Sequence, residues 1–144
     1  MKTYWEVALE DLEEAEFNLL HKHYRSAVFY LQQFAEKGAK ALLEKKDPGH
    51  RDMRSHAVEN VLIAYDEGHK VSDTADKARY LTGFYFNSRY PGDNYADITE
   101  AQAQKAHRLA LELRGYYESE LVKLKEIAAS VKIDLEGLSK LIRR

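Results

Sequence analysis

One helical face in this chain of 144 residues carries polar groups at a spacing that could bind a charged ligand. Gln33, Glu36 and Lys40 recur every three or four residues, so they share a face of a helix whose other face is apolar. Glu36 precedes Lys40 by one helical turn, which is the favourable order for an ion pair. The pattern predicts three aligned polar groups beside a buried surface.

A second polar pattern is Arg89-Tyr90-Pro91. Pro91 disfavours helical geometry at the residue before it, so a helix should end there with Arg89 near its end. A guanidinium at that place suits a phosphate group or a partner. A structural interpretation stands equally beside this one, because Arg89 could bind carbonyls at the helix end and Tyr90 could pack in the core.

Other kinds of catalytic chemistry find no support in the residue types. Helical bundles that bind metals use Glu-x-x-His pairs, and none of the six histidines follows a glutamate in this way. His21 and His23 point to different sides of a helix, and His50 stands in a turn. The chain has no cysteine, no Gly-x-Ser-x-Gly turn and no glycine-rich phosphate loop. We therefore predict no metal site and no cofactor.

Composition indicates one soluble domain. A chain of 144 residues is long enough to bury a substantial core without a second domain. The absence of cysteine excludes a disulfide scaffold and agrees with a reducing compartment. The first residues form no basic and apolar leader, and no apolar run approaches the length of a membrane span. We expect a cytoplasmic protein with no membrane partner.

Charge is unevenly distributed, although the formal net charge is only −2. Residues 2–20 are strongly acidic, and residues 21–54 are basic. We favour the interpretation that two neighbouring antiparallel helices carry these opposite charges and attract each other. The alternative is a basic patch for phosphate backbones, but a sequence pI near 6.3 argues against general affinity for nucleic acids.

Helical periodicity runs through the chain, and no segment alternates like a strand. We expect helices over about 3–21 and 24–46, a third from Ser55 to Gly68, a fourth from Ser72 or Asp73 to just before Tyr90, and a fifth from the capping box Thr99-Glu100-Ala101-Gln102 to about Ala128. These elements predict an all-α, up-and-down bundle of four to five helices over residues 1–130.

The pattern changes after Ser130. Asp134 could cap a short C-terminal amphipathic helix within residues 131–144, with an apolar stripe of Leu135, Leu138, Leu141 and Ile142. Such a helix is too short to be stable alone. We expect it to dock on its own bundle, with docking on another chain, as in a dimer, as the alternative.

The series of these patterns along the chain resembles the HEPN family, the nucleotide-binding helical domain of higher eukaryotes and prokaryotes. The resemblance covers about residues 2–128 and lies in the order and spacing of the pieces. They are Trp5 with Ala8-Leu9 and Asp11-Leu12, then Tyr24-Arg25-Ser26-Ala27, the run from Gln32 to Leu43, His56 with Val58 and Leu62, and Arg89-Tyr90-Pro91.

The ribonuclease branch of that family places a histidine four to six residues after an arginine. There the histidine takes a proton from a ribose hydroxyl while the arginine holds phosphate. Arg89 is followed at those offsets by Asp93, Asn94 and Tyr95, none of which can replace an imidazole. The spacing also occurs from Arg51 to His56, but at the wrong place in the family order. We interpret His56 as a helix-start residue that packs near the core.

The resemblance therefore implies a binding module rather than an enzyme. The chain is similar to small HEPN proteins that pair with a minimal nucleotidyltransferase in an arrangement like a toxin–antitoxin module. It implies a homodimer and a nucleotide such as ATP, or RNA, as ligand. The alternatives are a HEPN ribonuclease toxin whose catalytic histidine is displaced, to His56 or His107, and a purely structural dimeric scaffold.

By this resemblance the nucleotide-binding residues are Arg89 for phosphate and Tyr90 for stacking or for shaping the loop, with Lys40 and Lys37 as supporting cations. The structural alternative for the lysines is favoured, since Glu36 and Lys40 could simply neutralise each other. Aromatic residues crowd the fourth helix, and we expect them to form core or a dimer seam rather than a platform for bases. They are Tyr80, Phe84, Tyr85, Phe86 and Tyr90.

Overall fold

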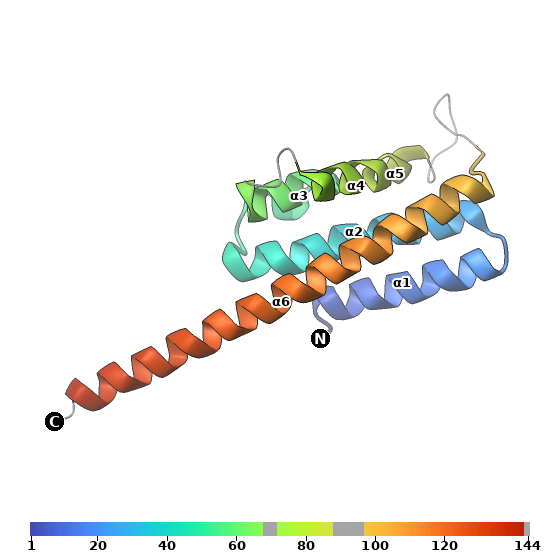
Figure 1. Ribbon diagram of the computed structural model, residues 1–144. Coiled ribbons are helices and arrows are strands. Elements are labelled where there is room, and N and C mark those ends of the chain that lie inside the picture. The colour runs from blue at the N-terminus through green and yellow to red at the C-terminus, as the bar shows by residue number, and fades with distance from the viewer. Residues whose placement is uncertain (68–71, 88–96, 143–144) are drawn as a thin grey trace.

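The computed structural model describes residues 1–67, 72–87 and 97–142, and in these ranges the chain contains helices and no strand. The helix α2 (Tyr24–Lys46) lies at the centre of the bundle. Figure 1 shows α1 (Tyr4–Leu20) on one side of α2 and the shorter helices α3, α4 and α5 on the other. The long helix α6 (Glu100–Ile142) crosses the bundle and continues beyond it. The predicted all-α helical fold is confirmed.

The first two helices follow the sequence pattern closely. Thr3 caps α1 by accepting a hydrogen bond from the backbone N–H of Glu6 at 3.1 Å. The apolar stripe predicted on α2 is fully buried; it contains Ala27, Leu31, Phe34 and Leu42. An ion pair joins the acidic first helix to the second, because Lys37 Nζ lies 2.6 Å from Asp11 Oδ2.

The middle of the chain forms more and shorter helices than predicted. A short 3₁₀ helix, Arg51–Arg54, precedes α3 (Val58–Tyr65), whose N-cap is Ala57 rather than Ser55. The fourth predicted helix is divided into α4 (Asp73–Thr82) and α5 (Phe84–Asn87), with Gly83 between them. Ser72 caps α4 as expected, through its side-chain oxygen and Ala75 N at 3.1 Å. Glycine is a poor helix former, which fits the break at this position.

Helix α6 completes the core. Its capping box is formed as predicted: Thr99 N donates to Gln102 Oε1 at 3.0 Å, and Gln102 N donates to Thr99 Oγ1 at 3.1 Å. Tyr117 is fully buried, and its hydroxyl donates to the Ala35 carbonyl of α2 at 2.7 Å. The Tyr117 ring lies against Gly38, where a Cβ would fall inside the van der Waals surface of the ring. Gly38 therefore sets how closely α2 and α6 approach.

The prediction of a separate C-terminal helix was wrong. Residues 131–142 continue α6 without interruption, and in the structure they are exposed rather than docked on the bundle. Nothing between Ala128 and Glu136 stops a helix, because that segment contains neither proline nor glycine. The aspartate expected to cap a new helix, Asp134, is an interior residue of α6.

Candidate functional site

A buried polar cluster lies where α2 meets the loop before α3. Glu36 is its centre: Oε2 accepts from Lys40 Nζ at 3.1 Å, and Oε1 accepts from Gln32 Nε2 at 3.3 Å. The same Oε1 lies 3.1 Å from Nδ1 of His56. Gln32 also donates to the His56 backbone carbonyl at 3.1 Å, so two contacts fix this histidine to α2. Buried polar groups are costly unless paired, and each of these has a partner.

His56 joins this cluster to the surface. Its ring stacks on Tyr85 of α5 with centroids 4.4 Å apart and an interplanar angle of 13°. The His56 side chain is 53% exposed, whereas the Glu36 side chain is 6% exposed. Thr82 holds the two elements together, because its hydroxyl accepts from Val58 N at 2.9 Å and donates to Glu59 Oε2 at 2.7 Å. The start of α3 and the end of α4 thus fix the stacked pair.

The arrangement gives the imidazole a defined orientation. In the neutral tautomer that donates Nδ1–H to the Glu36 carboxylate, Nε2 carries no proton. Lys40 balances the charge of the buried carboxylate. A histidine oriented in this way can accept a hydrogen bond from a ligand or take a proton from one. Tyr85, on which the imidazole stacks, is itself buried, so His56 is the exposed member of the pair.

The four residues predicted to bind nucleotide are not all placed in this cluster. Lys40 belongs to it as the partner of Glu36, as the structural alternative expected. Lys37 is directed to α1, where it pairs with Asp11. Burial raises the pKa of the Asp11 carboxyl, although the neighbouring Lys37 acts in the opposite direction. Arg89 and Tyr90 lie outside the described residues, and α5 ends at Asn87, shortly before them in the chain.

Sequence reasoning missed the role of His56. It lies in the loop before α3 rather than at the start of that helix, and it is exposed rather than packed near the core. The sequence contained one indication of it. Gln32, Glu36 and Lys40 lie four residues apart on one face of α2, and polar side chains buried on such a face need a polar partner from another element. The other candidate base, His107, lies on a different surface, where its Nε2 is 2.8 Å from Glu16 Oε2.

Two further observations concern a possible metal site and a possible second pocket. Within the described ranges, no three histidine, aspartate or glutamate side chains lie close enough together to hold a metal ion. A hollow of about 910 Å³ lies away from the Glu36 cluster, between the start of α1, the end of α2 and α6. Its lining is mostly apolar and includes Trp5, Leu121, Leu124 and Ile127. Its polar lining residues are Thr3, Glu44, Lys45, Lys46 and Lys125, and no histidine is among them.

Comparison with protein-family models matches residues 1–120 to the HEPN domain. The chain belongs to the HEPN family. An archaeal HEPN homologue of known crystal structure has the same fold, with a TM-score of 0.63 and 23% sequence identity. That similarity covers 83% of this chain and 98% of the archaeal chain. Comparison with curated proteins found no match.

The residues matched to the HEPN domain include the bundle and the Glu36 cluster but not the projecting part of α6. The match ends at residue 120, close to the point where α6 leaves the bundle, so the projecting part of α6 lies beyond the shared domain. The Glu36 cluster lies inside the shared domain. None of the helices in the described residues combines the length and hydropathy needed to cross a membrane.

Proposed function

We propose that this HEPN protein is a non-catalytic nucleotide-binding module whose ligand lies against the His56–Tyr85 pair. The observation that supports it is the stacked, half-exposed imidazole held by a buried carboxylate. Tyr85 precedes the segment with Arg89 and Tyr90 by only a few residues, and a chain of that length spans little more than about 14 Å. Arg89 would bind phosphate bidentately, and Tyr90 would stack on the base or shape the loop. Lys40 supports the site by pairing with the buried Glu36 carboxylate.

The test is a calorimetric titration of ATP and other nucleotides into the wild-type chain and Arg89→Ala, with thermal melting followed in parallel. We expect the variant to lose affinity by about tenfold or more, since a charge-assisted hydrogen bond contributes roughly 1.5–3 kcal/mol. Lys123→Ala is the matched control, because Lys123 is an exposed cation on α6 that pairs with nearby Glu120. Unchanged affinity in Arg89→Ala, at unchanged melting temperature, would contradict the assignment.

A second candidate is a ribonuclease that uses His56 as its base. It is favoured by the hydrogen bond that Nδ1–H of His56 donates to Glu36, because Nε2 of that tautomer can accept a proton from a ribose hydroxyl. Purified protein incubated with structured RNA separates the two candidates. Cleavage that His56→Ala abolishes and His107→Ala leaves intact would establish this second function, and inert wild-type protein would remove it. A chain that binds neither nucleotide nor RNA would be a structural scaffold.

The proposed module acts as a homodimer beside a minimal nucleotidyltransferase, in a pair like a toxin and antitoxin. This part rests on the HEPN membership and on the sequence after Arg89, where no histidine follows at the spacing of the ribonuclease branch. Co-expression of this chain with the product of a neighbouring nucleotidyltransferase gene checks it. A stable complex that changes the rate of nucleotide transfer supports the pairing, and two proteins that purify apart contradict it.

A further inference from the structure

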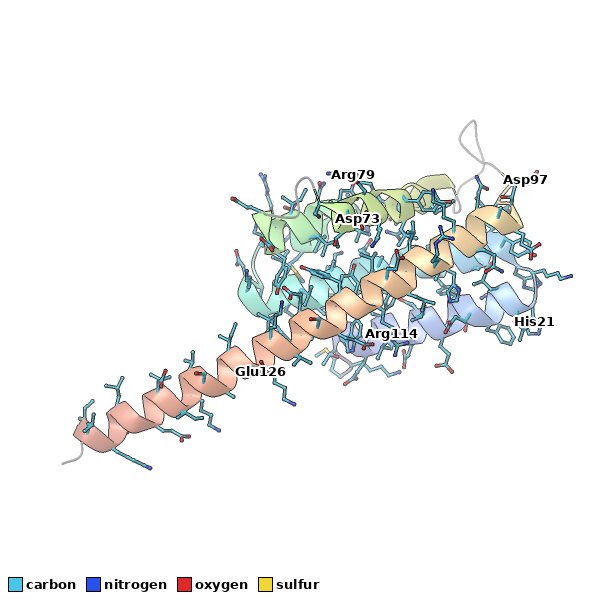
Figure 2. The ribbon with its side chains drawn as sticks, viewed as in Figure 1. His21, Asp73, Arg79, Asp97, Arg114 and Glu126 are labelled. Carbon is cyan, nitrogen blue, oxygen red and sulfur yellow. The ribbon has the colours of Figure 1, made fainter. Side chains whose placement is uncertain are left out.

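The hollow between α1, α2 and α6 combines an apolar lining with cations at its edge. Most of the side chains that line its volume of about 910 Å³ are apolar, and they include Trp5, Ala41, Leu121, Leu124, Ile127 and Ala128. Figure 2 shows Glu126 where α6 leaves the bundle, and its chain neighbours Lys125 and Ile127 line the hollow there. A concave, mostly apolar site with a few polar groups is typical of small-molecule pockets.

The hollow opens where α2 and α6 separate. The two helices lie close together at Gly38 and Tyr117. Further along both helices the lining includes Ala41 on α2 and Ala128 on α6, whose side chains are too short to fill the space between them. The Ile127 side chain, which also lines the hollow, is 59% exposed. Covering this surface with an apolar group is favourable, because it removes apolar area from water.

Two lysines at the edge of the hollow are not matched by acidic residues. Lys45 and Lys125 are exposed, and neither has an aspartate or glutamate three or four positions away on its own helix. Among the residues that the structure describes, none forms an ion pair with either lysine. Lys77 and Lys123, by contrast, each pair with an acidic residue on their own helix. The edge of the hollow therefore carries positive charge that a ligand can balance.

Helix ends account for only part of this charge. A cation in the last turn of a helix suits the helix dipole, and this applies to Lys45 and Lys46 at the end of α2. Lys46 is also held in place, because its Nζ donates to the Tyr65 carbonyl at 3.0 Å. Lys125 lies in the interior of α6, far from either end of that helix. With these three lysines and Glu44, the described lining has a formal charge of +2.

We propose that the hollow binds a fatty acid, with the alkyl chain against the apolar lining and the carboxylate beside Lys45 and Lys125. Lysine suits such an edge, since its stem packs on apolar surface while its ammonium stays in water. A neutral lipid would leave both lysines unmatched, and a polyanion such as ATP would leave the apolar lining uncovered. The site lies away from the His56–Tyr85 face and goes beyond the proposed nucleotide binding.

The first experiment uses the only tryptophan of the chain as a reporter, because Trp5 lines the hollow. Dodecanoate is titrated below its micelle concentration by calorimetry, and a brominated dodecanoate supplies a quencher of tryptophan fluorescence. We expect saturable quenching of Trp5 that unbrominated dodecanoate reverses. Dodecanol, with the same chain and no charge, should bind about fivefold more weakly or less tightly still. No quenching, or equal affinity for dodecanol, would overturn the proposal.

The second experiment removes the charge at the edge. Lys45→Gln combined with Lys125→Gln should weaken dodecanoate binding by about fivefold to tenfold and leave dodecanol binding unchanged, because two partly exposed ion pairs are lost. Lys123→Gln is the matched control, since Lys123 is a cation on α6 that does not line the hollow. The three lysines are exposed, so the variants should fold, and circular dichroism checks this. Unchanged affinity for dodecanoate in the double variant would contradict the assigned carboxylate position.

The third experiment tests the location by adding a like charge. Ala128→Glu puts a carboxylate inside the hollow and should weaken dodecanoate binding by about fivefold or more. Ser130→Glu puts the same group at an exposed position of α6 that does not line the hollow, and it should leave binding unchanged. Equal effects of the two substitutions would show that the fatty acid binds elsewhere.

Competition with nucleotide separates this proposal from the proposed function. ATP should not displace dodecanoate, because the two ligands use different surfaces. Displacement would place nucleotide in the hollow and overturn the fatty-acid assignment. A wild-type chain that binds ATP but no dodecanoate would also overturn it, while the proposed nucleotide binding would stand.

Discussion

At the scale of single residues, Gly38 leaves no room for a larger side chain. The Tyr117 ring fills the space that a Cβ would need, and Trp5 and Phe34 lie against that ring, with centroids 6.2 Å and 6.0 Å away. Gly38→Ala should therefore lower the free energy of unfolding by about 1–3 kcal/mol, as overpacked cores do. Urea denaturation followed by circular dichroism measures it.

Gly115 provides the matched control, because it lies in α6 with nothing within 4 Å of an added Cβ. Gly115→Ala should stabilise the chain by about 0.5–1 kcal/mol, since alanine favours a helix interior over glycine. Equal effects of the two alanine substitutions would show that the contact between Gly38 and Tyr117 does not limit the packing of α2 on α6.

The buried ion pair of Glu36 and Lys40 makes a second prediction at this scale. Glu36→Gln leaves the Lys40 ammonium buried without its counter-charge, so the free energy of unfolding should fall by about 3 kcal/mol or more. Adding Lys40→Met should recover part of that loss. Glu118→Gln removes an exposed pair with Arg114 and should cost less than about 1 kcal/mol. Thermal and urea unfolding of the wild type and the three variants check this, and a loss no larger for Glu36→Gln than for Glu118→Gln would refute it.

At the scale of elements, tyrosine hydroxyls form hydrogen bonds between α6 and the rest of the bundle. The packing of α6 should therefore be sensitive to high pH. The Tyr65 hydroxyl donates to Glu120 Oε1 at 3.2 Å. Burial, with the nearby Glu120 carboxylate, raises the pKa of Tyr65 to about 12. Burial also raises the pKa of Tyr117, which lies at the centre of the contact between α2 and α6.

These raised pKa values predict loss of stability in alkali. An unfolded tyrosine loses its proton near pH 10, whereas folded Tyr65 keeps it to about pH 12. Stability from this source is complete below pH 10 and is lost as the pH rises to about 12. Circular dichroism and phenolate absorbance should change together in that range, and Tyr65→Phe should weaken the dependence. Phenolate formation that leaves the helical signal unchanged would contradict the prediction.

The elements also show what the sequence could and could not predict. Helices α1 and α2 were predicted almost to the residue, because Thr3 caps the first and strict apolar periodicity runs through both. The break at Gly83 was missed, since a single glycine inside a helical pattern is usually tolerated. The continuity of α6 past Ser130 was missed because Asp134 looks like a cap when its neighbours are unknown.

For a similar reason, only part of the candidate site could be predicted from the sequence. Glu36 and Lys40 could be paired from their spacing on one helix. The contact from Glu36 to His56 joins residues twenty positions apart, and the stack on Tyr85 brings in a third element. No periodicity in a single sequence encodes such contacts between elements.

At the scale of the whole molecule, the chain combines a HEPN bundle over residues 1–120 with a projecting tail. The His56–Tyr85 face is formed by the loop before α3 and by α5, whereas the tail leaves the bundle along α6. The exposed residues 131–142 of α6 are therefore separate from that face. Val131→Asp, at an exposed position of this part of α6, is expected to leave the affinity for ATP within about twofold of wild type, as calorimetry would show.

The central claim is that nucleotide binds at the histidine held by Glu36. The most direct measurement is nuclear magnetic resonance of the histidine ring protons during a titration with ATP, assigned with His56→Ala and His107→Ala. We predict that the His56 signals shift and saturate, that the His107 signals stay in place, and that Arg89→Ala abolishes the shift. Saturable ATP binding that leaves His56 unmoved, or no binding at millimolar ATP, would contradict the account.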